Sequence, residues 1–223
     1  MKHAVELFLR ISLLAFTLFI WLWALNQPLS NTMNLFIIVG GVLWVFPIVW
    51  LGRMILDRQP TPSRAVWITT FVHYVMGIPF GAALIQAIST HQAWSDWKIP
   101  IPVEIGRVLV IITGAAVLLT VVNLALRGLG APFAIALSRR LAADWLYAWT
   151  RNPMVLAALA WLLALGIWFQ SGLFVLSVVV LFTPALLFFV KVYEERELES
   201  RFGSSYLVYK SRTPMLFPRR PGG

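Results

Sequence analysis

Residues 151–198 read RNPMVLAALAWLLALGIWFQSGLFVLSVVVLFTPALLFFVKVYEEREL, and this stretch decides the fold class. No charged residue occurs between Arg151 and Lys191. The run is long enough for two membrane-spanning helices, because a hydrocarbon core of about 30 Å takes about 20 helical residues. Its two polar ends therefore lie at the same mouth of a helical hairpin. Charges are costly in a bilayer, so polar groups held at such a mouth mark a candidate site.

The composition places the whole chain in a membrane. Of its 223 residues, 60% are hydrophobic and 12% are charged, with a mean hydropathy of +0.81. A soluble domain of this size needs far more polar surface. The absence of cysteine excludes disulfides, a thiolate nucleophile and cysteine-ligated metals. His73 and His91 lie in different segments, so we expect no metal site.

Six apolar stretches are long enough to span the membrane, and they lack the alternation of barrel strands, so we predict helices. They are approximately Val5–Leu25, Met33–Leu56, Trp67–Ala87, Ile105–Leu126, Pro153–Phe169 and Leu173–Val190. The predicted fold is all-α, a polytopic membrane protein with about six transmembrane helices. The first stretch could instead be a signal peptide, but no small-x-small site follows Leu25, which favours a retained helix. Pro47, Pro79 and Pro184 fall within these stretches and are expected to kink them.

The charges predict the orientation. If the N-terminus is cytoplasmic, every Lys and Arg except Lys98 and Arg107 lies on the inner side, which satisfies the positive-inside rule. We therefore expect both termini and the polar cluster to face the cytoplasm, in a bacterial or archaeal inner membrane. The net charge of +9 fits this rule and contacts with anionic membrane lipids. We expect no nucleic-acid partner, because the basic residues sit between apolar runs.

The motif Arg151-Asn152-Pro153 has two interpretations. In the structural one, Pro153 occupies the first helical turn, Asn152 caps the helix and Arg151 reaches toward the headgroups. In the functional one, Arg151 and the free helix N-terminus present positive potential to a carboxylate or phosphate.

The acidic motif that begins at Glu194 also has a structural and a functional interpretation. A solvated interfacial helix would show the same i,i+4 pairs, Lys191 with Glu195 and Glu197 with Arg201. Yet four of the chain's nine acidic residues cluster between 194 and 199, on a side that is otherwise basic. Two adjacent carboxylates at the membrane exit can bind a cation or a hydroxyl pair.

Two further features have equally plain alternatives. The segment Gly128-Leu129-Gly130-Ala131-Pro132 is either a helix C-terminus or a place where the backbone approaches a ligand closely. It is no dinucleotide-binding fingerprint, because no strand precedes it and no third glycine follows. Tyr206 and Tyr209 are either interfacial anchors or the walls of a pocket.

Together these motifs resemble the integral-membrane methyltransferases of the isoprenylcysteine carboxyl methyltransferase and phospholipid N-methyltransferase group. The matching pattern is, in chain order, Gly128-x-Gly130-x-Pro132, Tyr147, Arg151-Asn152-Pro153-Met154, Glu194-Glu195-x-x-Leu198, Phe202-Gly203-x-x-Tyr206-x-x-Tyr209 and Pro218. It covers roughly residues 105–218. We accordingly divide the chain into variable N-terminal helices, 1–100, and a methyltransferase core, 101–218, made of a helix, a cytosolic loop, a helical hairpin and a C-terminal interfacial segment.

The resemblance implies S-adenosylmethionine as methyl donor, held in a cytosol-facing pocket. The expected cofactor-binding residues are Gly128, Gly130, Tyr147, Arg151, Asn152, Pro153, Met154, Glu194 and Glu195. Carboxylates suit the donor's sulfonium, ammonium and ribose diol, and Arg151 suits its carboxylate. The residues expected to serve the reaction itself are Arg151, Glu195 and Tyr206, the last two as bases if the acceptor is an ammonium.

The expected acceptor is lipophilic, with a phospholipid amine favoured over a prenylcysteine carboxylate and a small thiol left open. The chain departs from the family pattern at three places. Trp145-Leu146 stands where Gly-Pro often precedes the tyrosine, Asn152 where many members have His, and Val155 where Tyr is common. The alternative function is a non-catalytic relative, a transporter or assembly factor. A transporter should show charges within its spans or paired broken helices, and neither is evident.

Overall fold

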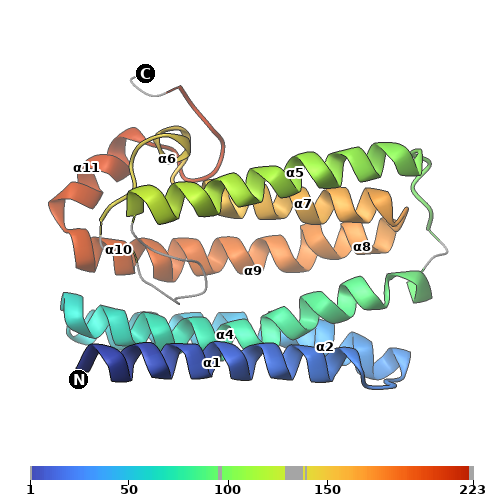
Figure 1. Ribbon diagram of the computed structural model, residues 1–223, viewed down its shortest axis with the longest axis horizontal. Coiled ribbons are helices and arrows are strands. Elements are labelled where there is room, and N and C mark those ends of the chain that lie inside the picture. The colour runs from blue at the N-terminus through green and yellow to red at the C-terminus, as the bar shows by residue number, and fades with distance from the viewer. Residues whose placement is uncertain (1, 95–96, 129–137, 139, 221–223) are drawn as a thin grey trace.

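The computed structural model describes residues 2–94, 97–128, 138 and 140–220 (Figure 1). Its helices lie roughly parallel in two groups. The N-terminal group contains α1 (Lys2–Leu25), α2 (Asn31–Leu43), α3 (Val45–Arg58) and α4 (Pro62–Ser89). The second group contains α5 (Val103–Asn123), α7 (Pro153–Trp168) and one long helix. That long helix runs through α8 (Gly172–Ser177), η3 (Val178–Phe182), α9 (Thr183–Phe188), η4 (Phe189–Glu194) and α10 (Glu195–Phe202).

Four short elements complete the described fold. The 3-10 turn η1 (His91–Trp94) follows α4, and the π turn η2 (Leu124–Gly128) ends α5. The short helix α6 (Leu146–Trp149) precedes α7, and α11 (Ser204–Arg212) follows α10. Figure 1 places α6, α10, α11 and both termini at one end of the bundle.

The all-α prediction is confirmed. Within the described ranges there is no β-strand, only an isolated bridge between Lys98 and Ser171. Among the described residues, five helices are long and apolar enough to cross a membrane, namely Phe8–Leu25, Asn31–Arg58, Pro62–Ser89, Val103–Gly128 and Gly172–Phe202. The remaining predicted span is the apolar helix α7, which has only 16 residues. At a rise of 1.5 Å per residue, α7 is about 24 Å long, shorter than a typical hydrocarbon core.

The interior proline of α4 is accommodated by a neighbouring tryptophan. Pro79 has no N–H to donate to the carbonyl of Val75, four residues earlier. The indole Nε1 of Trp44 donates to that oxygen instead, at 3.1 Å. Gly41 allows this approach, because a Cβ there would lie 2.4 Å from the Pro79 oxygen. Trp44 also marks the break between α2 and α3.

The two helix groups share one apolar core. Val49 and Leu56 of α3 and Val72 of α4 are fully or almost fully buried in the same cluster as Phe182 and Tyr193 of the long helix. Burying apolar side chains from both groups ties them together at roughly 25 cal/mol per Å² of apolar surface. The N-terminal helices are therefore packed directly against the helix that carries the acidic motif.

Candidate active site

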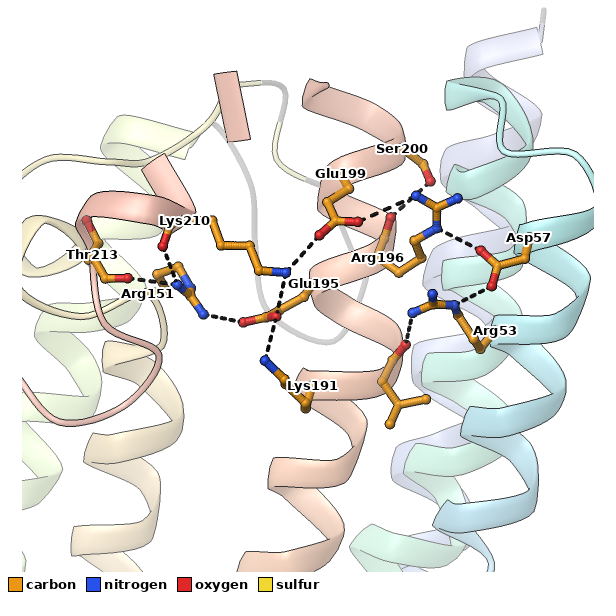
Figure 2. Close-up of polar contacts among 11 residues, drawn as sticks. Arg53, Asp57, Arg151, Lys191, Glu195, Arg196, Glu199, Ser200, Lys210 and Thr213 are labelled. Carbon is orange, nitrogen blue, oxygen red and sulfur yellow. Dashed lines mark hydrogen bonds and ion pairs between the residues drawn. The ribbon is translucent and has the colours of Figure 1, made fainter. Parts of the chain in front are cut away.

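The motif that starts at Arg151 and the acidic motif that starts at Glu194 meet at the end of the bundle where α10 and α11 lie (Figure 2). Arg151 precedes α7, Glu195 begins α10 and Lys210 lies on α11. The Nη2 of Arg151 is 2.5 Å from Oε1 of Glu195, and Nζ of Lys210 is 2.9 Å from Oε2 of the same carboxylate. Nζ of Lys191 lies 3.5 Å from Oε2 as well, so three cations neutralise this carboxylate, which is only 3% exposed.

Arg151 is a buried connector rather than a side chain that reaches for headgroups. Its Nη1 donates to the carbonyl oxygens of Lys210 at 2.7 Å and Thr213 at 2.8 Å. With Nη2 on Glu195, both terminal nitrogens are engaged. A bidentate pair between Arg151 and a ligand carboxylate would therefore require these nitrogens to give up their present bonds. The Nε of Arg151 is buried and has no hydrogen-bond partner among the described residues.

The segment after α11 folds back over the start of α7. The side chain of Asn152 donates through Nδ2 to the carbonyl of Met215 at 2.8 Å, and the hydroxyl of Thr150 donates to the same oxygen at 3.1 Å. The backbone N–H of Arg151 donates to the carbonyl of Pro214. Asn152 does occupy the N-cap position of α7, but its side chain makes no capping bond. The predicted cap is wrong: capping needs Oδ1 to accept from a helical N–H, whereas the side chain is oriented by the bond from its Nδ2 to the Met215 carbonyl.

Pro153 and Met154 form the first turn of α7. Pro153 is buried at the start of the helix, where its missing N–H leaves no bond unmade, as predicted. Met154 is half-buried beside it. The motif thus combines a rigid helix start with side chains that hold the C-terminal segment.

Glu194 differs from the other acids of its motif. Glu195 is paired as described, Glu197 pairs with Arg201 at 2.6 Å, and Glu199 pairs with Lys210 at 2.8 Å. Within the part of the chain that the structure describes, Glu194 has neither a hydrogen bond nor an ion pair. It is half-buried, so it is the carboxylate of this cluster that is available to a ligand.

Two tyrosines, Tyr147 and Tyr206, lie near these acids, and Tyr209 contacts Tyr147. Burial raises the pKa of Tyr147 well above its ordinary value, and the negative charge of Glu194 raises it further. Burial likewise raises the pKa of Tyr206, with Glu195 as the next cause. The hydroxyl of Tyr209 donates to the carbonyl of Tyr147 at 2.7 Å. At neutral pH these phenols are therefore protonated, and they can form an apolar wall with hydrogen-bond donors.

The glycine motif is only partly described. Gly128 is buried at the end of η2, and a Cβ on it would meet a side-chain carbon of Leu124 at 3.0 Å. Its carbonyl accepts a hydrogen bond from the N–H of Arg140 at 3.1 Å. The close contacts of Gly128 are thus made with other residues of the protein, Leu124 and Arg140. Gly130 lies outside the described residues.

The position at which the chain departs from the family pattern has an unusual backbone. Trp145 has a φ of 52°, a conformation that favours glycine. The next N–H, of Leu146, donates to Oδ1 of Asn123 at 3.0 Å. The guanidinium of Arg127 lies 4.7 Å from the centre of the Trp145 ring. The turn therefore keeps a glycine-like conformation although tryptophan occupies it.

Comparison with known families covers the segment that supplies most of this cluster. Residues 102–205 match the phospholipid methyltransferase family. The resemblance predicted from the motifs is thereby confirmed for this segment of the chain. Comparison with curated proteins and with solved structures gives no match.

Sequence reasoning missed Lys210, which lies just beyond the phospholipid methyltransferase match. A signal was present, because four clustered acids require cations and Lys210 directly follows the motif tyrosine Tyr209. Asn123 lies within the match. Its Oδ1 accepts from the N–H of Leu146 at the start of α6, and its buried Nδ2 has no partner among the described residues.

Proposed function

We propose that this protein is an S-adenosylmethionine-dependent methyltransferase of the membrane, with its site at the cytoplasmic end and a lipophilic acceptor. The observation that supports this most directly is Glu194, a half-buried carboxylate without a partner among the described residues, beside Tyr147 and Tyr206. It lies within the phospholipid methyltransferase segment.

The described residues fit the methyl donor. S-adenosylmethionine carries an ammonium, a sulfonium and a ribose diol, each of which a carboxylate such as Glu194 binds. It also carries a carboxylate, for which the buried and unpartnered Nε of Arg151 is a donor. Tyr147, Asn152, Pro153 and Met154 would line the same place, with Gly128 at its edge, and Gly130 stays a sequence-based expectation.

The methyl donor supplies, when bound, an electrophilic methyl group that an acceptor atom displaces in line. Such a displacement needs little covalent help, so the protein's part is to orient both partners and to exclude water. Tyr206 is 1% exposed and Tyr209 is 8% exposed, so this wall keeps water out. The pair of Arg151 with Glu195 holds the start of α7 against α10.

We favour a phospholipid amine as the acceptor because of the family match. A protonated amine must lose a proton before it can be methylated. Glu195 is already neutralised by Arg151 and Lys210, and the raised pKa of Tyr206 keeps its phenol protonated. We therefore assign positioning roles to Glu195 and Tyr206, and propose that the amine reacts in its neutral form.

The test is titration calorimetry of S-adenosylmethionine into the detergent-solubilised protein. Glu194→Gln should weaken binding by about 1.5–3 kcal/mol, the scale of a hydrogen bond to a charged group. Glu104→Gln is the matched control, because Glu104 is an exposed acid at the opposite end of α5. Absence of wild-type binding at millimolar cofactor would overturn the proposal and favour the non-catalytic alternative. Transfer of a labelled methyl group to vesicles with or without an amine phospholipid then tests the acceptor.

A further inference from the structure

We propose that Arg53 and Asp57, on α3, are positioning residues for the turn that carries Glu194 and Glu195. Both lie outside residues 102–205, so the family match does not assign them any role. The inference rests on the proposed function only for its binding readout. It is carried by three sets of contacts between the N-terminal helices and Val192, Tyr193 and Arg196 of the long helix.

The first set acts on the backbone next to Glu194. The Nη1 of Arg53 donates to the carbonyl oxygen of Val192 at 2.9 Å, within the π turn η4 (Figure 2). The Nε of Arg53 is 2.5 Å from the carboxylate of Asp57, which fixes the direction of the guanidinium. π turns break the regular helical bonding pattern and are frequent at functional sites. A donor from α3 therefore holds the irregular turn two residues before Glu194.

The second set holds Tyr193, the residue between Val192 and Glu194. Tyr193 is fully buried, and its hydroxyl is 2.9 Å from the hydroxyl of Thr69 on α4. Its ring rests against Gly52 of α3, where an added Cβ would lie 3.1 Å from the ring. Tyr193 is thus fixed by two N-terminal helices, and its rotation about the helix axis is set. The side chain of Glu194 projects one residue further along the same turn.

The third set reaches the charges of the site. Asp57 accepts from Nε of Arg196 at 2.7 Å, and Arg196 lies 3.5 Å from Glu199. Glu199 pairs with Lys210 at 2.8 Å, and Lys210 in turn pairs with Glu195 at 2.9 Å. Figure 2 shows this as one connected row of ion pairs from α3 to Arg151. Each outer pair is partly exposed and contributes little alone, so the expected effect of the row lies in orientation.

The experiment is a double-mutant cycle on the full chain, with Asp57→Asn, Lys210→Met and the combined variant. S-adenosylmethionine affinity is measured by calorimetry, and amide hydrogen exchange is measured over residues 192–199 without cofactor. Asp57→Asn should weaken binding about threefold and speed exchange about threefold, within the range of coupling through contact networks. The combined variant should bind more tightly than the product of the two single effects predicts, because both changes interrupt one row.

The controls separate positioning from general damage. Glu104→Gln should leave affinity and exchange unchanged, and Asp57→Glu should recover most of the wild-type exchange pattern. Unchanged exchange over 192–199 in Asp57→Asn, or effects that multiply in the combined variant, would overturn the positioning role. If the wild type binds no cofactor, the proposed function fails, while the exchange readout still decides the positioning role.

Discussion

Arg151 and Glu195 are 2.5 Å apart, and their side chains are only 9% and 4% exposed. Taking two charges out of water costs several kcal/mol per ion, which the pair recovers only through close geometry and further hydrogen bonds. Here the carbonyls of Lys210 and Thr213 and the ammonium of Lys210 supply those bonds. The pair therefore joins three elements, and the loss of one partner leaves a buried charge behind.

Removal of either partner should destabilise the whole fold. Arg151→Met and Glu195→Gln are each expected to cost about 3 kcal/mol, near the low end for a broken buried pair. The double variant should cost less than the sum, because no buried charge is left unpaired. Thermal unfolding in detergent measures this. Asp144→Asn breaks the exposed pair with Arg127 and should cost less than about 1 kcal/mol. Equal, small effects from all variants would contradict the prediction.

Alkaline pH should unfold the protein early. The pKa values of Tyr206 and Tyr209 are raised above 10.0 by burial. For Lys210, burial lowers the pKa, but hydrogen bonds with Glu199 and Glu195 outweigh it and the net shift is upward. All three folded-state pKa values exceed the unfolded ones. The stability that these three groups contribute is therefore fully present below about pH 10, and it is lost as pH rises through their folded-state pKa values.

The variant that checks this is Tyr206→Phe. It removes one group whose proton is held more tightly in the folded state. The decline of stability above pH 10 should become shallower, by up to about 1.4 kcal/mol per pH unit. Thermal unfolding between pH 7 and 11.5 measures the slope. A slope identical to that of the wild type would be evidence against the raised pKa of Tyr206.

Asn152 should control the C-terminal segment. Asn152→Ala removes the donor to Met215 and is expected to cost about 1 kcal/mol, the net value of one hydrogen bond. Hydrogen exchange should rise selectively in the segment around Met215, and the interior of α7 should remain protected. Ser211→Ala is a suitable control, because its hydroxyl bonds only to the nearby carbonyl of Val208. Unchanged protection around Met215 would show that the remaining bonds suffice.

The backbone at Trp145 allows a comparison of two small residues. Trp145→Gly and Trp145→Ala both lose the ring and its contact with Arg127. Only glycine adopts a φ of 52° without a steric penalty. Trp145→Gly should therefore be more stable than Trp145→Ala by about 1 kcal/mol, within the cost of a strained residue. Chemical or thermal unfolding of the two variants decides the order, and a more stable alanine variant would refute the assignment.

The helical class, and the meeting of the polar motifs at one end of the bundle, followed from the sequence because both depend on local signals. Long apolar runs demand closed hydrogen bonding, and charged residues at their ends stay near the interface. The resemblance to the methyltransferase family could also be predicted, because it rests on the order of motifs along the chain. The interior proline of α4 was also visible. The sequence does not predict that Trp44 supplies the missing donor, because Trp44 lies between α2 and α3 whereas Pro79 lies within α4.

The pairing within the site depends on tertiary contacts, which a linear pattern does not specify. Glu194 and Glu195 are adjacent and chemically identical, yet only Glu195 faces Arg151 and Lys210. The π turn that ends at Glu194 changes which way the side chains point, and nothing in a linear pattern marks such a turn. The cap predicted for Asn152 was wrong for a related reason, because a carbonyl from a distant segment orients this side chain through its Nδ2, and no helical N–H bonds to its Oδ1.

The long helix Gly172–Phe202 has 31 residues and is therefore about 46 Å long, whereas the hydrocarbon core is about 30 Å thick. Its charged residues begin at Lys191, so we expect the excess length at the end that carries the acidic motif. Bilayer thickness then sets how far the carboxylates stand above the acyl chains. In thicker membranes they sink toward the headgroups, and in thinner ones they rise into water. Acyl-chain length is thus expected to act on this protein as a control on the height of its site.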